Sequence, residues 1–134
     1  MIVKRFGLAF ALAVIFLAAT AALRYAATQG YIAEDFATRA VQVIIGLGLA
    51  AYANLMPKQV GGSRRSVEAE TRAQAAQRVG GWSITLAGLI HAGLWAFAPL
   101  SFASPGSMVV VGGAVILTLG HALWCYTACR RAGA

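Results

Sequence analysis

Long stretches without a charged residue constrain this chain more than any other feature of its sequence. Eleven of its 134 residues are Lys or Arg and four are Asp or Glu, yet none of these occurs from Phe6 to Leu23, from Ala40 to Pro57, or from Val79 to Cys129. A helix needs about 20 apolar residues to cross a hydrocarbon layer about 30 Å thick. The first two stretches therefore predict one membrane span each, and the third is long enough for two.

The segment PLSFASPG, from Pro99 to Gly106, divides the longest stretch, because it contains two prolines and a glycine. The expected spans are residues 6–27, 38–56, 79–98 and 107–129, with a cytoplasmic loop at 57–78. The spans are continuously apolar and rich in Ala, Leu and Gly, which is typical of helices. The sequence thus predicts one domain, residues 1–134, with an all-α integral membrane fold, a bundle of four transmembrane helices.

The distribution of Lys and Arg predicts the orientation of these spans. Only Arg24 and Arg39 fall on one side of a four-span arrangement, and every other Lys and Arg falls on the opposite side. Basic residues accumulate on the cytoplasmic side of a membrane. We therefore expect both termini in the cytoplasm, and we attribute the net charge of +7 to this bias and not to nucleic-acid binding. The first span also has the basic start of a secretory signal, but its apolar run is long for one.

Several local features of the spans and loops can be interpreted. Gly46 and Ala50, four residues apart, predict a close contact between helices. We expect a short interfacial helix in the outer loop at residues 27–36, with Gly30 as a helix breaker, and a cytoplasmic helix at 66–78 that leads into the third span. Asn54 lies one turn from the cytoplasmic end of the second span, where it caps carbonyl groups or contacts a neighbouring helix.

The fourth span carries a candidate metal site. His121, Cys125 and Cys129 are spaced by four residues, so they share one face of a helix. Imidazole and thiolate together suit Cu(I) or Zn. Three ligands spread over about 12 Å of helix cannot all reach one ion, so His121 and Cys125 are the candidate ligands and a second helix would have to complete the site. The alternative is ordinary helix packing.

His91 and His121 are a candidate pair for a haem or quinone site, because two histidines on neighbouring spans are the minimum for bis-histidine haem ligation. Five glycines lie near them and would either make room for a macrocycle or let the third and fourth spans approach closely: Gly88, Gly93, Gly112, Gly113 and Gly120.

Other functional classes find less support in the sequence. The central part of each span contains no Asp, Glu, Lys or Arg, which ion-coupled transporters commonly use. Passive passage of a small molecule needs a polar path, and Gln42, Tyr52 and Asn54 are too few to line one. No serine or threonine has a convincing base beside it in the sequence, which disfavours a hydrolase.

One region resembles a known family. The sequence ANLMPK, from Ala53 to Lys58, followed by RVGG, from Arg78 to Gly81, resembles the membrane domain of the SdpI-like family of bacterial immunity and signalling proteins. The resemblance covers roughly 30 residues, and the chain lacks the Arg-Thr-Pro turn and the loop tryptophan of that family. It implies a protein that protects against a toxic peptide or sequesters a regulator, with four partner-binding positions: Asn54, Pro57, Lys58 and Arg64.

Together these patterns predict a small non-enzymatic protein of the bacterial inner membrane. We expect it to act through contacts with another membrane protein or a second copy of itself, as an accessory subunit or an immunity-type factor, without a cofactor. The alternatives are a redox subunit that binds haem or quinone through His91 and His121, and a small transporter.

Overall fold

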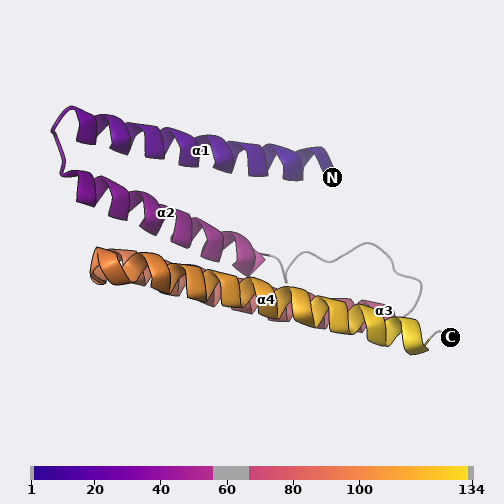
Figure 1. The fold of residues 1–134 in the computed structure, drawn as a ribbon. Coiled ribbons are helices and arrows are strands. Elements are labelled where there is room, and N and C mark those ends of the chain that lie inside the picture. The colour runs from indigo at the N-terminus through magenta and orange to yellow at the C-terminus, as the bar shows by residue number, and fades with distance from the viewer. Residues whose placement is uncertain (1, 56–66, 133–134) are drawn as a thin grey trace.

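The computed structural model describes residues 2–55 and 67–132, and these residues form four helices with short connections. Helix α1 spans Ile2–Thr28, α2 spans Glu34–Leu55, α3 spans Val67–Phe97 and α4 spans Leu100–Ala132 (Figure 1). All four are long and apolar enough to cross a membrane. The prediction of an all-helical chain with four candidate spans is confirmed.

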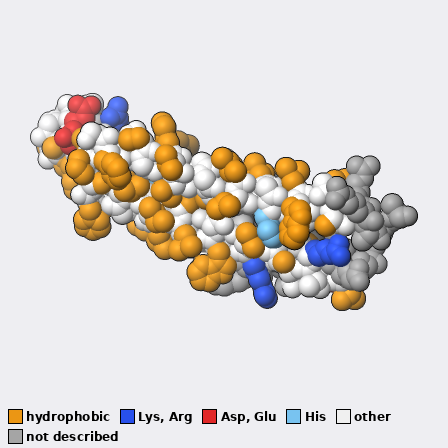
Figure 2. Space-filling model, turned by 60° about the horizontal axis from the view of Figure 1, so that its bottom comes forward, with side chains coloured by type: hydrophobic (Ala, Val, Ile, Leu, Met, Phe, Trp, Pro, Cys, Tyr) orange, Lys and Arg blue, Asp and Glu red, His pale blue; other side chains and the backbone are white. Residues whose placement is uncertain are grey.

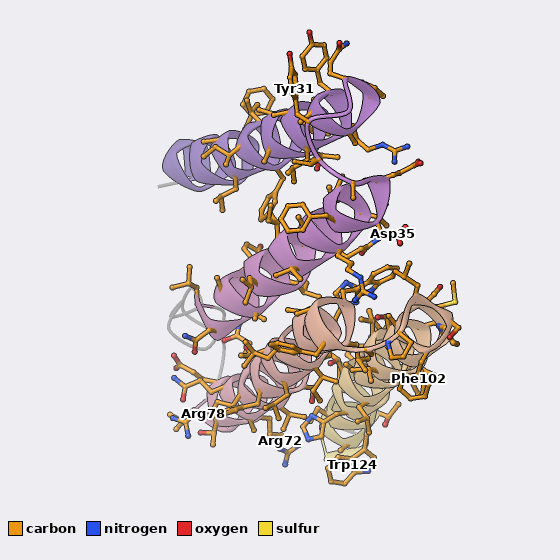
Figure 3. The ribbon with its side chains drawn as sticks, turned by 90° about the vertical axis from the view of Figure 1, so that its left-hand side faces the viewer. Tyr31, Asp35, Arg72, Arg78, Phe102 and Trp124 are labelled. Atoms are coloured by element: carbon orange, nitrogen blue, oxygen red, sulfur yellow. The ribbon has the colours of Figure 1, made fainter. Side chains whose placement is uncertain are left out.

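The helices pack in chain order as an open row. Among the described residues, α1 packs against α2, α2 against α3, and α3 against α4, while no other pair of helices meets. The end-on view in Figure 3 shows α2 between α1 and the pair formed by α3 and α4. The two outer helices of the row, α1 and α4, therefore each have one neighbour.

The connection between α1 and α2 is a tight turn. Tyr31 N donates to the carbonyl oxygen of Ala26 at 2.9 Å and Gly30 N donates to that of Ala27 at 3.0 Å, the pair of bonds that closes a Schellman motif. Gly30 has a φ of 75°, which a residue with a side chain rarely adopts. Gly30 is thus the predicted breaker, but the expected interfacial helix at 27–36 is wrong, because α2 already begins at Glu34 with two acids in its first turn.

Helix α3 begins before the expected third span. It runs without interruption from Val67 to Phe97, so the expected helix at 66–78 and the span after it are one element. Gly80 and Gly81 are buried inside this helix. Helix α4 likewise begins at Leu100, seven residues before the expected span, and contains Pro105 in its second turn. The break between the two helices is therefore confined to Ala98 and Pro99.

The backbones of α2 and α3 cross closely at two glycines. A Cβ atom on Gly46 would lie 2.7 Å from the carbonyl oxygen of Gly88, and a Cβ atom on Gly88 would lie 2.6 Å from that of Gly46. The Cβ atom of Ala92 would lie 3.0 Å from a Cβ atom on Gly46, and that of Ala50 would lie 3.1 Å from a Cβ atom on Gly88. Such small residues let helix backbones approach in a membrane. The predicted close contact at Gly46 and Ala50 is confirmed.

The contact between α3 and α4 does not use the glycines proposed for it. Gly88 faces α2, and a Cβ atom on Gly93, Gly112, Gly113 or Gly120 would have no atom within 4 Å. The contact instead places Gly80 against Thr118, and Leu94 against Gly106. The expectation that those five glycines bring α3 and α4 together is therefore wrong.

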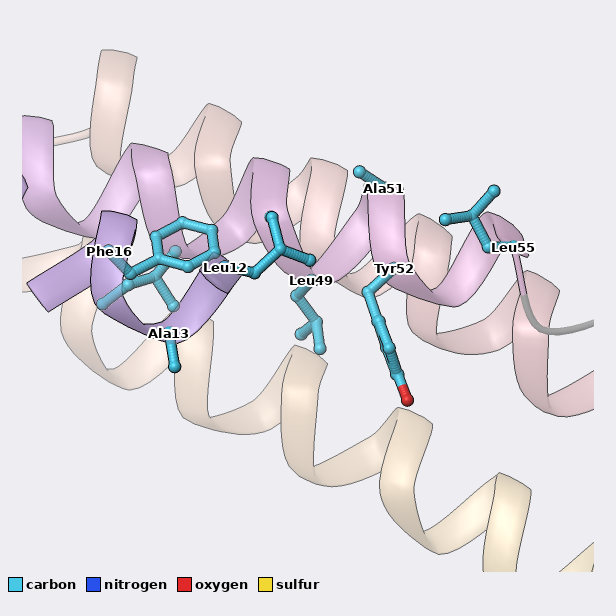
Figure 4. Close-up of a pocket in the computed structure, with 9 residues that line it drawn as sticks. Leu12, Ala13, Phe16, Leu49, Ala51, Tyr52 and Leu55 are labelled. Carbon is cyan, nitrogen blue, oxygen red and sulfur yellow. The ribbon is translucent and has the colours of Figure 1, made fainter. Parts of the chain in front are cut away.

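The contact between α1 and α2 includes an aromatic ring packed on a glycine. The ring of Phe16 occupies the space that a side chain on Gly48 would need. Beside this contact lies an apolar groove of about 560 Å³, whose lining includes Leu12 and Phe16 of α1 and Leu49, Tyr52 and Leu55 of α2 (Figure 4). No residue in the apolar window of α1 is buried, so this contact holds α1 only loosely to the row.

The buried part of the described chain is small. Its buried hydrophobic residues are alanines and Trp95, and no large side chain is fully buried. Figure 2 shows hydrophobic side chains along the length of one face, with the acidic side chains at one end. This arrangement leaves most large apolar side chains free to face lipid or another protein.

Candidate functional site

A polar contact joins α2 and α3 about one turn from the Gly46–Gly88 crossing. Nε2 of His91 lies 3.2 Å from Oε1 of Gln42, and both side chains are half-buried. The ring of His91 also lies against that of Trp95, with centroids 6.3 Å apart. With the amide oxygen of Gln42 as the acceptor, Nε2 of a neutral His91 is the donor, and Nδ1 is then the acceptor nitrogen.

Helix α4 completes a pocket around this pair. The pocket is open, has a volume of about 380 Å³ and receives side chains from three helices. Its lining residues are Gln42 of α2, His91 and Trp95 of α3, and Ser104, Ser107, Met108, Val111 and Gly112 of α4. Gly112 has no atom within 4 Å of where its Cβ atom would be, so its lack of a side chain keeps the pocket open.

Three buried polar atoms of this pocket have no hydrogen-bond partner in the described part of the chain. They are Nδ1 of His91, Nε1 of Trp95 and Oγ of Ser107. Trp95 is 9% exposed and Ser107 is 6% exposed. A buried polar group without a partner costs about 1–3 kcal/mol, so three of them in one pocket mark it as the candidate functional site.

Arg39 of α2 binds the end of α3, near the pocket. Its Nη1 donates to the carbonyl oxygens of Trp95 and Ala98, each at 2.9 Å. Helix α3 ends between these two residues, so the guanidinium caps carbonyl groups that have no helical partner. This cap holds the start of α2 against the end of α3 and thereby positions Gln42, one turn further along, opposite His91.

The candidate metal ligands lie elsewhere, toward the other end of α4. Nδ1 of His121 lies 3.7 Å from Sγ of Cys125, and its ring lies 6.0 Å from that of Trp124. In residues 2–55 and 67–132 no group of three His, Cys, Asp or Glu side chains is placed to hold a metal ion. The side chain of Cys129 lies outside the described part. His121 and Cys125 are thus adjacent, and no second helix contributes a described ligand to them.

The structure does not bring His91 and His121 together. His91 faces the part of α4 between Ser104 and Gly112, while His121 lies nine residues further along, about 14 Å at the helical rise of 1.5 Å per residue. The two imidazoles have different neighbours, Gln42 and Trp95 for one and Trp124 and Cys125 for the other. A haem held by both is not favoured by this placement.

Of the positions implied by the family resemblance, the structure describes one. Asn54 is exposed near the end of α2. Pro57, Lys58 and Arg64 lie outside the described residues.

Sequence reasoning singled out His91 but missed Trp95 and Ser107. Both belong to uncharged spans, where Trp and Ser are ordinary residues, and only the packing of α3 on α4 shows that their polar atoms are buried. One signal was present: His91 and Trp95 are four residues apart and therefore share a face of α3.

Comparison with known proteins finds no matching family model, no matching curated protein and no matching solved structure.

Proposed function

We propose that the chain is an integral protein of the bacterial inner membrane with both termini in the cytoplasm. Four long apolar helices support the membrane location. An even number of spans would leave both termini on one side of the membrane; in Figure 1 the start of α1 and the end of α4 lie at the same end of the helices, and the bias of Lys and Arg supports the cytoplasm for that side.

We further propose that the protein catalyses no reaction and works as a subunit, through lateral contacts with another membrane protein or a second copy of itself. The open row of helices carries this proposal, because α1 and α4 each have only one neighbour among the described helices. A protein that used only its own four helices would bury more of them by closing the row into a bundle.

One flank of α4 is suited to such a contact. Gly113, Leu117 and Gly120 share this side of the helix, since they are spaced by four and three residues. The two glycines have nothing within 4 Å of where a Cβ atom would be, and Leu117 is 65% exposed. Small residues beside exposed apolar ones are typical of helix interfaces in membranes. We call this surface the glycine flank.

The resemblance of residues 53–81 to SdpI-like proteins suggests a specific form of this function. In that form the partner is a toxic peptide or a regulator, and Asn54, Pro57, Lys58 and Arg64 make the contact.

Site-directed crosslinking tests the subunit proposal. With Cys125 and Cys129 replaced by serine, Leu117→Cys places a single thiol on the glycine flank, and Leu119→Cys places one on the opposite side of the same helix at nearly the same depth. A thiol crosslinker applied to native membranes should join the Leu117→Cys chain to a partner of defined mass and leave the Leu119→Cys chain unjoined. Equal crosslinking of both variants, or of neither, would argue against a specific lateral contact at this flank.

A further inference from the structure

Two pockets of nearly equal volume lie on the two flanks of the α3–α4 contact. One is the pocket of about 380 Å³ at Gln42, His91 and Ser107. The other, about 360 Å³, is lined mostly by apolar residues of α3 and α4 together with Ser83. All three unpaired buried polar atoms of the described chain belong to the first pocket. The second pocket, whose lining includes Gly113 and Leu117 of the glycine flank, has none of these atoms and is the comparison for the first.

The unpaired atoms define which chemical groups fit the first pocket. Nε1–H of Trp95 only donates, the hydroxyl of Ser107 donates and accepts, and Nδ1 of His91 accepts while Nε2 is bonded to Gln42. A hydroxyl group has the complementary capacity, because its oxygen can accept from the donors Trp95 and Ser107 and its hydrogen can be donated to His91.

The rest of the pocket selects against charge. Among the residues that the structure describes, no Asp, Glu, Lys or Arg lines it, and the nearby Arg39 already donates to two carbonyl groups of α3. Its remaining walls include Met108, Val111 and the ring of Trp95, which favour an apolar body. A volume of about 380 Å³ lies at the small end of ligand pockets and suits a ring system, not a whole phospholipid.

We propose that this pocket binds the hydroxyl-bearing ring of an uncharged, lipid-soluble molecule, held by hydrogen bonds to Trp95, His91 and Ser107. Such a ring is found in a quinol-type lipid and in a sterol-like lipid. The site lies about 9 Å, six residues, from the end of α3, within the depth that a membrane-dissolved ring reaches from the lipid. The proposal does not depend on the subunit function proposed above.

Binding of small ring compounds to the whole protein in lipid nanodiscs tests the proposal. Isothermal titration against empty nanodiscs of the same lipid corrects for partition into the bilayer. We expect saturable binding of 1-naphthol, and binding at least fivefold weaker for 1-methoxynaphthalene, which keeps the acceptor oxygen but has no hydrogen to donate to His91. Equal affinity for the two compounds would overturn the proposal.

Two matched variants assign the binding to this pocket. Ser107→Ala should weaken 1-naphthol binding about fivefold, the effect of one lost neutral hydrogen bond. Ser83→Ala, the same substitution in the second pocket, should leave the affinity within about twofold, because Ser83 holds none of the unpaired atoms. Equal losses in the two variants would contradict the assignment.

A direct spectroscopic readout complements these affinities. With Trp82 and Trp124 replaced by phenylalanine, Trp95 gives the only indole N–H signal in a nitrogen–proton NMR spectrum. This signal should shift downfield when 1-naphthol is added, since Nε1–H gains an acceptor. An unchanged signal at saturating ligand would refute the hydrogen bond to Trp95.

Comparison with 2-decalol, a saturated ring alcohol, identifies the source of the ring. Tighter binding of 1-naphthol indicates a quinol-type ligand, and tighter binding of 2-decalol indicates a sterol-like one. Either result supports the hydroxyl site. If neither alcohol binds, the proposal is rejected, and water is the remaining partner for the three unpaired atoms.

Discussion

The guanidinium of Arg39 on α2 donates a hydrogen bond to the backbone carbonyl oxygen of Trp95 on α3, at 2.9 Å, and a second one from the same nitrogen to that of Ala98. These carbonyl groups lie at the end of α3, where the helix has no further donors and carries a partial negative charge. The cap accounts for the presence of Arg39 on the side of the membrane where the charge bias predicts few basic residues.

Replacing Arg39 by glutamine should lower the free energy of unfolding by about 2 kcal/mol, because two hydrogen bonds from a charged donor and a favourable dipole interaction are lost. Unfolding in mixed detergent micelles, followed by circular dichroism, measures this change. Arg24→Gln is the matched control. Arg24 and Glu34 are 3.9 Å apart and largely exposed, so this substitution should cost less than about 0.5 kcal/mol. Similar losses in the two variants would show that the cap contributes little.

The crossing of α2 and α3 leads to a second prediction. Gly46→Ala or Gly88→Ala places a methyl group within 2.7 Å of a carbonyl oxygen on the opposite helix, so the backbones must separate. Each variant should lose about 1–3 kcal/mol of stability, the usual cost of overpacking. Gly93→Ala, also in α3 but facing open space, should gain up to about 1 kcal/mol through helix propensity. If Gly46→Ala were as harmless as Gly93→Ala, the close crossing would be refuted.

The small residues of α2 show how far the sequence could predict this packing. The spacing of Gly46 and Ala50 was sufficient to expect a close helix contact, but a glycine does not specify which helix approaches it. Gly88 was assigned to the α3–α4 contact, although it faces Gly46. Which helix packs against a given glycine depends on all the side chains along both helices, and a local sequence pattern does not contain that information.

Helix ends were predicted less well than spans for a related reason. Hydropathy marks the length that crosses a membrane, but a helix continues past that length wherever its residues favour it. Residues 67–78 extend α3 in this way, and residues 100–106 extend α4 despite Pro105. Pro105 has no amide hydrogen to donate to Ser101, so it removes one hydrogen bond from the second turn of α4 without ending the helix.

The candidate site was only partly predictable. His91 was recognised as one of two histidines on neighbouring spans, and Gln42 was noted as a polar residue of α2. Their contact at 3.2 Å follows from the register of α2 on α3, which the Gly46–Gly88 crossing and the Arg39 cap fix together. Nothing in the sequence indicates that Ser107 of α4 is buried beside them.

The buried hydroxyl of Ser107 leads to a third prediction. Because Oγ has no partner in the described chain, Ser107→Ala removes an unpaired polar group and introduces a better helix former. In the absence of added ligand this variant should be more stable by about 1 kcal/mol, measured by the same micelle unfolding. A residue kept for stability would behave in the opposite way. A loss of stability in Ser107→Ala would show that its hydroxyl is paired within the protein.

The contact between Gln42 and His91 can be measured with a double-mutant cycle. Gln42→Met and His91→Leu remove the two partners separately and together, so the coupling energy isolates their interaction. We expect a coupling of about 0.6 kcal/mol, the average for hydrogen bonds between membrane helices, and no more than about 1.7 kcal/mol. Gln42→Met combined with Thr118→Val is the control pair, since Thr118 donates to Ala114 within α4. A coupling near zero for Gln42 and His91 would refute the hydrogen bond.

The proposed orientation is tested by two exposed glutamines, one expected on each side of the membrane. Gln29 is exposed in the turn between α1 and α2, and Gln74 is exposed in the early part of α3 that the charge bias assigns to the cytoplasm. With Cys125 and Cys129 replaced by serine, Gln29→Cys should react with a membrane-impermeant maleimide in intact cells. Gln74→Cys should react only after the membrane is opened. Both variants replace an exposed glutamine, so a difference in labelling reports the side of the membrane. The reverse labelling pattern would mean that Arg24 and Arg39 lie in the cytoplasm and that both termini are outside.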